Sequence, residues 1–422
     1  MTPEIKQRIQ QIRQGKTPKG YKKTKEGIIP DAWNVKPVGE CIEEYRKLSN
    51  DIRTYTVYSS SRNGLIPQSD YYDQKEAVET NKGYNLVPKG YITYRHMSDD
   101  DIFHFNINTT GSSILVSNEY PVFTTNCKFN TYFLVSALNE SKRFLAFCKM
   151  QKKGGTRTRL YLSNLKQYPL PLPPLPEQTA IAEILSTQDR VIELKEQLLA
   201  EKKRQKKYLM QQLLTGKMRL KGFKGEWKKC RLGEVAKFSK GYGYSKSDIS
   251  INGEIPIILY GRLYTNYKTI IKDIDTYTNT KIRNAVFSKG NEVIVPASGE
   301  TAEDIAIASC IEPEGVILGG DLNIIYPNET ILPSYLANLI SYGPLHLELS
   351  KKAQGKSVVH LHNDDLSNVI IEFSPLPEQT AIAEILSTAD REIELLGQSI
   401  EAEKRKKKSL MQLLLTGIVR VP

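Results

Sequence analysis

Apolar residues recur at every seventh position along two stretches of the chain, residues 174–216 and 375–417. Apolar partners three or four positions away widen each row, and one lysine interrupts it, Lys206 in the first row and Lys407 in the second. A seven-residue repeat of this length is typical of a helix whose apolar seam packs against another helix in a coiled coil. The predicted seam residues are Ile181, Leu185, Ile192, Leu199, Leu209, Leu213, Ile382, Leu386, Ile393, Leu396, Ile400, Leu410 and Leu414.

The two stretches are also copies of one another, at an offset of about 201 residues and with about 31 of 43 positions identical. Each begins with Pro-Leu-Pro-Glu-Gln and ends with Leu-Leu-Thr-Gly, which suit the first turn and the glycine cap of a helix. About 40 helical residues span on the order of 60 Å, so neither helix can bury its seam against itself. Because a globular segment separates the copies, the sequence predicts that they pair antiparallel. The alternative is that each helix packs on its own domain.

Residues 21–172 and 218–372 carry short strand-like runs separated by glycine, proline, asparagine and aspartate, which predicts two globular domains of the α+β class. The two segments share an opening phrase around Trp33 and Trp227 and then diverge. They are therefore predicted to be one fold with two different surfaces. Two repeated helices that hold two different globular domains would suit the recognition of two different halves of one target at a fixed distance.

Residues 1–20 form a predicted amphipathic helix, and its ending at Gly15 resembles the exit of the long helix at Gly216. The chain is therefore predicted to be a pseudo-two-fold cyclic repeat whose two ends lie close together. The predicted segments are an N-terminal helix over 1–20 that completes the cycle, a globular domain over 21–172, a long helix over 173–217, a second globular domain over 218–372 and a second long helix over 373–422.

Charge and cysteine content narrow the class of protein. The chain has 59 Lys and Arg against 47 Asp and Glu, a net charge of +12, which fits a nucleic-acid partner. Its 5 cysteines are far apart and form no CxxC pair, which suits a reducing compartment and offers no zinc cluster. A run of about 18 apolar residues is absent and the first residues are polar, which predicts an intracellular protein that does not span a membrane.

The repeated Pro-Leu-Pro-Glu-Gln helices, each preceded by a variable domain that opens at a tryptophan and a Gly-Glu pair, resemble the specificity subunit of type I restriction–modification systems. The resemblance covers essentially the whole chain, and further matching phrases are Tyr260-Gly261-Arg262 and Ala297-Ser298-Gly299-Glu300-Thr301. It implies a subunit that is not an enzyme, needs no cofactor and lies in the cytoplasm.

The same resemblance implies the partners. Each globular domain would be a target-recognition domain that reads one half of a bipartite sequence in double-stranded DNA. The paired helices would set the spacing between the halves. Two methyltransferase subunits would dock on this chain, and motor–nuclease subunits would join the assembly.

Sequence patterns for catalysis and metal binding are weak. The [DN]PP[YF] tetrapeptide of adenine methyltransferases is absent, and Gly15-Lys16-Thr17 and Gly355-Lys356-Ser357 lack the earlier glycine that a phosphate loop needs. The acidic cluster that begins at Asp70 favours a solvated turn, and His360 with His362 lacks a third ligand, so no metal is predicted. Two alternatives stay open: a coiled-coil structural or adaptor protein without sequence-specific DNA reading, and an enzyme with a cryptic nuclease site.

Candidate DNA contacts lie in loops that carry arginine, serine, asparagine and small residues, because arginine is the usual bidentate partner of guanine. Each candidate could instead be a turn residue or a phosphate contact. Arg262→Ala is predicted to relax recognition at one position of the second half-site, whereas a uniform loss would indicate a phosphate contact. The candidates are Ser60, Arg62, Asn63, Arg95, Arg157 and Arg159 in the first domain, and Tyr260, Arg262, Ser298, Thr301, Lys356 and Ser357 in the second.

Overall fold

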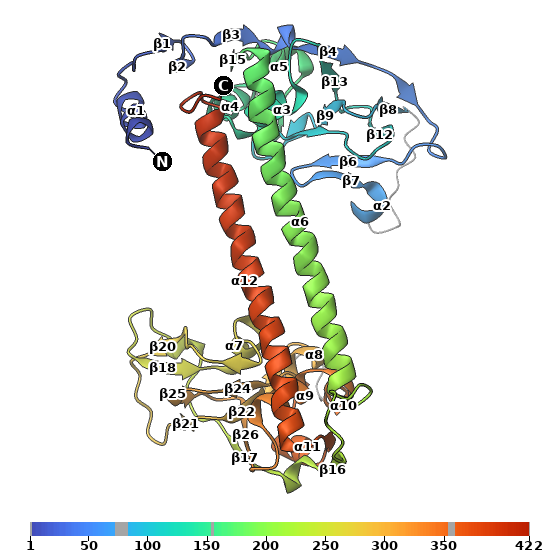
Figure 1. Cartoon of the computed structure of the whole chain (residues 1–422), viewed down its shortest axis with the longest axis vertical. Coiled ribbons are helices and arrows are strands. Elements are labelled where there is room, and N and C mark those ends of the chain that lie inside the picture. The colour runs from blue at the N-terminus through green and yellow to red at the C-terminus, as the bar shows by residue number, and fades with distance from the viewer. Residues whose placement is uncertain (1, 72–82, 153–155, 353–358, 422) are drawn as a thin grey trace. The chain divides into compact units, whose positions relative to one another are not determined.

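The computed structural model describes residues 2–71, 83–152, 156–352 and 359–421, and the chain divides into two units. The first unit joins Met1–Lys195 to Ser399–Pro422, and the second is the continuous segment Glu196–Gln398. The division cuts both long helices. Each unit therefore holds one globular domain, the first half of one long helix and the last half of the other (Figure 1).

The globular part of the first unit is built on two antiparallel sheets, one with the strand order β11-β9-β13-β4 and one with the order β12-β8-β5. The strands of this unit are β1 (Tyr21–Thr24), β2 (Gly27–Pro30), β3 (Asn34–Pro37), β4 (Ile42–Tyr45), β5 (Leu48–Ser49), β6 (Tyr58–Ser61), β7 (Gly64–Pro67), β8 (Tyr84–Val87), β9 (Ile92–Tyr94), β10 (Met97–Ser98), β11 (Phe105–Ile107), β12 (Ile114–Ser117), β13 (Val122–Thr125), β14 (Thr158–Arg159) and β15 (Pro169–Leu172). Its shorter helices are α1 (Pro3–Arg13), η1 (Val38–Glu40), α2 (Gln68–Tyr71), α3 (Thr131–Glu140), α4 (Lys142–Met150) and α5 (Leu162–Leu165).

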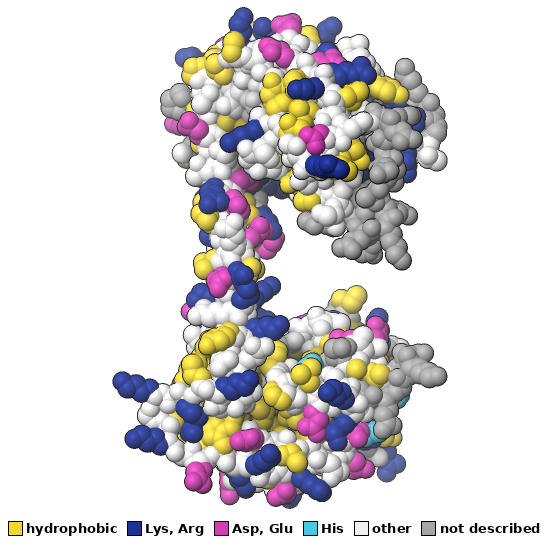
Figure 2. Space-filling view, turned by 90° about the vertical axis from the view of Figure 1, so that its right-hand side faces the viewer, with side chains coloured by type: hydrophobic (Ala, Val, Ile, Leu, Met, Phe, Trp, Pro, Cys, Tyr) yellow, Lys and Arg dark blue, Asp and Glu magenta, His cyan; other side chains and the backbone are white. Residues whose placement is uncertain are grey.

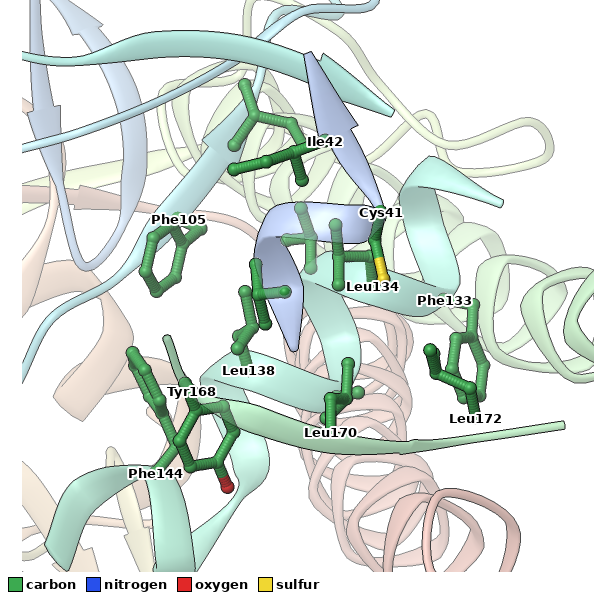
Figure 3. Close-up of a cluster of buried hydrophobic side chains, with 14 of the residues drawn as sticks. Cys41, Ile42, Phe105, Phe133, Leu134, Leu138, Phe144, Tyr168, Leu170 and Leu172 are labelled. Carbon is green, nitrogen blue, oxygen red and sulfur yellow. The ribbon is translucent and has the colours of Figure 1, made fainter. Parts of the chain in front are cut away.

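A buried apolar cluster joins the four-stranded sheet of the first unit to α3 and α4. Side chains from β11, η1, α3, α4 and β15 converge in it, and Figure 3 labels ten of them. Aromatic rings meet edge to face there, with the ring centroids of Phe144 and Tyr168 4.9 Å apart. The Asn130 side chain starts α3 by accepting a hydrogen bond from the Phe133 N–H. Capping and apolar burial together fix these helices on the sheet.

The second unit carries a five-stranded sheet with the order β17-β26-β22-β24-β19 and a four-stranded sheet with the order β20-β18-β25-β21. Parallel pairing joins β18 to β25 and β19 to β24. Its strands are β16 (Lys228–Arg231), β17 (Ala236–Lys240), β18 (Ile255–Ile258), β19 (Ile270–Ile271), β20 (Tyr277–Thr278), β21 (Phe287–Lys289), β22 (Glu292–Pro296), β23 (Ser298–Gly299), β24 (Ser309–Ile311), β25 (Glu314–Leu318), β26 (Leu322–Pro327), β27 (Val359–His360) and β28 (Ile370–Phe373). Its shorter helices are η2 (Leu232–Glu234), η3 (Lys246–Asp248), α7 (Tyr260–Thr265), α8 (Ala302–Ile305), α9 (Pro333–Ser341), α10 (Gly343–Lys352) and α11 (Asn363–Ser367).

The two long helices are α6 (Leu175–Leu213) and α12 (Leu376–Leu414), each 39 residues long. In the first unit the start of α6 packs beside the end of α12, so that Leu185 and Leu414 share one buried cluster. In the second unit the roles are exchanged, and Leu213 shares a cluster with Leu386. The helices are therefore antiparallel, and the predicted α+β fold with an antiparallel helix pair is confirmed. α6 begins one residue before Pro176 and α12 one residue before Pro377, so each of these prolines lies in the first turn of its helix.

Every predicted seam side chain is at least partly removed from solvent. The buried members are Ile181, Leu185, Leu213, Ile382, Leu386, Ile400 and Leu414. The half-buried members are Ile192, Leu199, Leu209, Ile393, Leu396 and Leu410. Among the described helices, none combines the length and the apolar composition needed to cross a bilayer.

The C-terminal ends of the two long helices are built alike, as the predicted cyclic repeat requires. Gly216 and Gly417 have φ angles of +67° and +69°, the left-handed conformation that ends a helix. Gly216 lies against the ring of Trp227, and Gly417 lies against the ring of Trp33. Each exit thus packs on the opening tryptophan of one globular domain. Residues near the two ends of the chain also meet, since the Arg8 Nη1 donates to the Ile418 carbonyl at 2.7 Å.

Candidate nucleic-acid interface

The Glu-Gln pair at the start of each long helix anchors that helix to its unit. Glu177 is 4% exposed and accepts hydrogen bonds from Arg420, which follows the exit of α12. Glu378 is 1% exposed and receives two hydrogen bonds of 2.7 Å from Arg219, which follows the exit of α6. We call these two contacts the Glu–Arg clamps. Each one ties the start of one long helix to the end of the other, and the carboxylate raises the pKa of the Arg420 and Arg219 guanidinium groups.

The glutamine after each glutamate holds the globular domain. Gln178 Oε1 accepts the N–H of Asn130, the residue that caps α3, at 2.9 Å. Gln379 Oε1 accepts the N–H of Leu332, the residue before α9, at 2.7 Å. The side-chain amides of both glutamines also donate to nearby backbone carbonyls. The repeated Glu-Gln pair therefore fixes the orientation of one domain helix relative to each long helix.

The lysines that interrupt the apolar seam are paired across the two long helices. Lys206 is 8% exposed, and its Nζ lies 2.6 Å from Asp390 in the second unit. Lys407 makes the matching contact with Asp189 at 2.5 Å in the first unit. Because a buried ammonium group without a partner is costly, these pairs select the antiparallel register in which lysine faces aspartate.

A short two-stranded ribbon occupies the same place in both globular domains. In the first domain β10 pairs with β14, so that Met97 faces Arg159. In the second domain β23 pairs with β27, so that Ser298 faces His360. Arg159 and His360 stand at matching positions of the repeat. The ribbon thus presents different side chains from one scaffold in the two domains.

The ribbon of the first domain gathers most of the arginines proposed to contact DNA. Arg157 Nε donates to Asp99 at 2.7 Å, and Arg62 forms an ion pair with Asp100 from the neighbouring β6–β7 turn. Arg95, just after β9, and Arg159, on β14, are exposed beside them. The structure therefore brings these four arginines to one region, with two aspartates that orient two of them.

The other two candidates of the first domain differ in exposure. Ser60 is 5% exposed, and its hydroxyl accepts a hydrogen bond from the Asn106 side chain at 2.8 Å. Asn63 lies exposed in the β6–β7 turn, where its N–H donates to the Ser61 hydroxyl. Asn63 is therefore placed for contact with a large partner, whereas the Ser60 hydroxyl serves the interior of the domain.

In the second domain the candidates separate into two groups. Ser298 is 5% exposed on the ribbon, and its hydroxyl lies 3.2 Å from the His360 Nδ1. Thr301 follows the ribbon and caps α8 by accepting the Asp304 N–H at 3.1 Å. Tyr260 and Arg262 lie elsewhere, on α7. Lys356 and Ser357 lie outside the described residues.

Arg262 is held by its own surroundings. Its Nε donates to the Thr276 hydroxyl at 3.0 Å, and its Nη1 donates to the Asn266 side chain at 3.0 Å. Asp275 lies 3.5 Å from its Nη2. The side chain is partly exposed, so the network fixes the direction of the guanidinium group at the surface of α7.

Three of the cysteines are buried in the globular domains. Burial raises the pKa of the Cys41, Cys148 and Cys310 thiols to about 12, which disfavours the nucleophilic thiolate. Burial also lowers the pKa of His96. In the part of the chain that the structure describes, no three His, Cys, Asp or Glu side chains are grouped to hold a metal ion. Lysine and arginine side chains are spread over the visible face of each globular part (Figure 2).

Sequence reasoning missed the Glu–Arg clamps and the lysine–aspartate pairs. The identity of the Pro-Leu-Pro-Glu-Gln phrase in both copies was the available signal, because a glutamate kept in both helix starts needs a reason beyond the helix dipole. Its arginine partner lies 243 residues away in the first unit, and no local pattern identifies a partner at that distance.

Comparison with known proteins agrees with this arrangement. Residues 11–204 and 224–404 match the family described as type I restriction modification DNA specificity domain. The chain is 26% identical over 418 residues to the type I restriction enzyme MjaVIII specificity subunit of Methanocaldococcus jannaschii, covering 93% of this chain and 94% of that protein. It is 27% identical over 428 residues to the putative MjaX specificity subunit of the same organism, covering 95% and 97%.

A solved structure supports the fold. The type I restriction–modification system S subunit from M. genitalium superimposes with a TM-score of 0.56 at 13% identity, covering 90% of this chain and 96% of that one. At this identity the likeness concerns the fold alone. The family match, by contrast, includes both copies of the repeat, and the chain belongs to the family of type I restriction–modification DNA specificity domain proteins.

Proposed function

We propose that this chain is the DNA sequence-specificity subunit of a type I restriction–modification complex. Its two globular domains, over residues 21–172 and 218–372, are target-recognition domains that each read one half of an asymmetric bipartite sequence. The observation that carries the proposal is the pair of matching ribbons: one scaffold position displays Arg159 in the first domain and His360 in the second. Side chains that differ at matching places suit half-sites that differ.

The long helices act as the frame in this proposal. The Glu–Arg clamps and the glutamine anchors repeat in both units, so the helix pair would hold the two domains at a set spacing. Two methyltransferase subunits dock on this frame, and motor–nuclease subunits join them. The chain itself is non-catalytic, and the assembly acts on double-stranded DNA in the cytoplasm.

The deciding experiment is methylated-base mapping of DNA from cells that express this chain with its methyltransferase partner, compared with the partner alone. We expect methylation at one asymmetric motif made of two short blocks around a fixed unspecified gap. The absence of a motif, or the same motif without this chain, would show that the partner selects its own sites, and a coiled-coil adaptor would then be the better description.

The ribbons give a sharper version of the experiment. Arg159→Ala is expected to relax one half of the motif and His360→Ala the other half, each by about tenfold to a hundredfold in discrimination, because one base contact contributes roughly 1–3 kcal/mol. Methylated-base mapping of each variant measures the change. If both variants affected the same half, or all sequences equally, the assignment of one domain to one half-site would be wrong.

A further inference from the structure

A glycine-rich loop of the second unit lies beside the ribbon β23–β27. We call residues 240–246 the Tyr242 loop; it runs from the last residue of β17 to the first residue of η3. The Gly241 N–H donates to the Leu322 carbonyl at 2.9 Å, and the neighbouring Asp321 carbonyl accepts the Ala297 N–H at 2.8 Å. The Asn323 side chain then donates to the Leu361 carbonyl, next to β27. The start of β26 thus connects the Tyr242 loop to both strands of the ribbon.

The conformation of the Tyr242 loop is tightly determined. A Cβ atom on Gly241 would lie 1.9 Å from the Gly319 carbonyl oxygen, so only glycine fits there. Gly243 has a φ angle of +64° and accepts the Gly320 N–H at 3.0 Å. Tyr244 has a φ angle of +25°, a strained value for a tyrosine, and is 5% exposed. Its hydroxyl accepts the Ile282 N–H at 3.1 Å. The fold therefore maintains a strained turn at this point.

The turn carries an exposed aromatic residue that lies between two lysines in the sequence. Tyr242 is 52% exposed, although an aromatic side chain gains free energy when it is buried. Lys240 and Lys246 flank it and are both exposed. In the part of the chain that the structure describes, neither lysine takes part in an ion pair. Asp248, the nearby acidic side chain, accepts the Ser245 N–H and caps its own short helix.

The first unit has a comparable loop at the corresponding place. Residues 46–53 follow β4, the strand that matches β17, and contain the exposed cations Arg46, Lys47 and Arg53. The two-residue strand β5 lies within this segment, and its Leu48 is 51% exposed; Ile52, after β5, is 57% exposed. The two loops share no sequence. Both nevertheless combine positive charge with exposed apolar side chains after the first strand of the sheet.

We propose that the Tyr242 loop is a DNA-binding element of the second domain. Lys240 and Lys246 contact backbone phosphates, and the Tyr242 ring packs against a base step of the duplex. The contribution of the two lysines to DNA affinity falls as the salt concentration rises. The contribution of an apolar ring in a groove does not depend on salt in this way. The rigid turn reduces the ordering cost of binding. This inference rests on the proposed function, since it deepens the description of how the second domain holds its half-site.

The test measures binding of the full chain, assembled with its methyltransferase subunits, to a fluorescent duplex carrying the mapped motif and to a scrambled duplex. Titrations between about 50 and about 200 mM salt give the slope of log K against log salt. For Lys240→Ala with Lys246→Ala we expect the slope to fall by about 2, since each phosphate contact contributes about 0.9. The matched control is Lys228→Ala with Lys229→Ala on β16, which removes the same charge and should leave the slope unchanged.

Tyr242 is tested separately. Tyr242→Ala is expected to weaken binding about tenfold, because one base–aromatic contact contributes a binding free energy of that order, whereas Tyr242→Phe keeps the ring and most of the affinity. The control is Phe287→Ala, which removes a 47% exposed ring from β21. If Tyr242→Ala binds as tightly as the parent, or if the lysine variants match their control, the loop is not a DNA contact while the proposed function stands. If the parent complex itself binds both duplexes equally, both proposals are wrong.

Discussion

The two units of this protein share a frame and differ in the sheets attached to it. In both, a buried glutamate at the start of one long helix meets an arginine after the end of the other, and a lysine of the seam meets an aspartate. The sheets differ, since the first unit is wholly antiparallel in its two main sheets and the second includes parallel pairs. A residue at a contact between the two helices can change only if its partner residue in the same chain still fits it. A surface residue that meets only an external partner is not restricted in this way.

The frame itself is not perfectly symmetric. In the first unit Glu403 accepts hydrogen bonds of 2.8 Å from both Gln188 and Lys195. The matching positions in the second unit are Lys202, Ala389 and Leu396. The opening tryptophans differ as well: Trp33 Nε1 donates to Glu177 at 3.0 Å, whereas the Trp227 Nε1 is buried without a hydrogen-bond partner among the described residues. These differences allow the two units to be tested against one another in a single chain.

The largest effect is expected at the lysine of the seam. Asp390→Ala leaves the Lys206 ammonium buried without its partner and should raise the free energy of the native second unit by about 3 kcal/mol. Hydrogen exchange of the seam amides measures this loss as faster local opening. Adding Lys206→Met should restore most of it, because an apolar side chain suits the position.

The Tyr132 hydroxyl also donates to Asp189, so the matched control in the first unit is Asp189→Ala made in a Tyr132→Phe chain and compared with Tyr132→Phe alone. The lysine that pairs with Asp189, Lys407, has a side chain that is 26% exposed, against 10% for Lys206, so water compensates for more of the lost contact. An equal loss of protection in the two units would contradict the argument from burial.

The next effect concerns the opening tryptophans. Trp33→Phe removes a hydrogen bond to the buried Glu177 carboxylate and should cost about 2 kcal/mol more than Trp227→Phe, because hydrogen bonds to charged groups contribute roughly 1.5–3 kcal/mol. Trp227→Phe removes a donor that already lacks a partner. Hydrogen exchange of each unit compares the two variants, and equal costs would show that ring volume, not the hydrogen bond, determines the effect.

The smallest effect is a pH dependence at Glu403 in the first unit. The Lys195 and Gln188 hydrogen bonds lower the pKa of Glu403 from 4.5 to about 2. A depressed carboxylate pKa contributes stability above its unfolded value, and that stability is lost as the pH falls from about 4.5 to about 2. The seam amides near Glu403 should therefore exchange faster in that window, after correction for intrinsic rates.

Glu403→Gln is the control for this pH dependence, because it keeps the shape of the side chain without its charge. It should flatten the response in the first unit. Around Lys202 in the second unit no carboxylate occupies the matching position, so the same response there would point to a different titrating group.

The structure of the repeated helices could be predicted from the sequence. The seven-residue rows predicted the antiparallel helices, and residues such as Leu185 and Leu386 are buried as those rows require. Sequence was insufficient where partners are distant. Lys206 was visible as an interruption of the seam, but its pairing with Asp390 depends on a register that only the folded pair defines.

The candidate DNA contacts show the same limit. Arg157 and Arg159 were selected for their chemistry, and the fold places them with Arg62 because β10 pairs with β14. Ser60 was selected for its position near a turn, yet the alternation of β6 directs its hydroxyl to Asn106 in the interior. The composition of a loop shows which of its side chains could contact DNA. Strand pairing determines which side of the sheet each of them faces.

The way the chain is divided has a consequence for its synthesis. The second unit is continuous in sequence, but the first is completed only by the segment that begins at Ser399. A ribosome must therefore translate the whole second domain before the first can bury Leu185 against Leu414. At roughly 5–20 residues per second, this leaves the early half of the seam uncovered for on the order of ten seconds or more. Most of the buried cluster of the first unit is translated early, but its contact with α12 forms last.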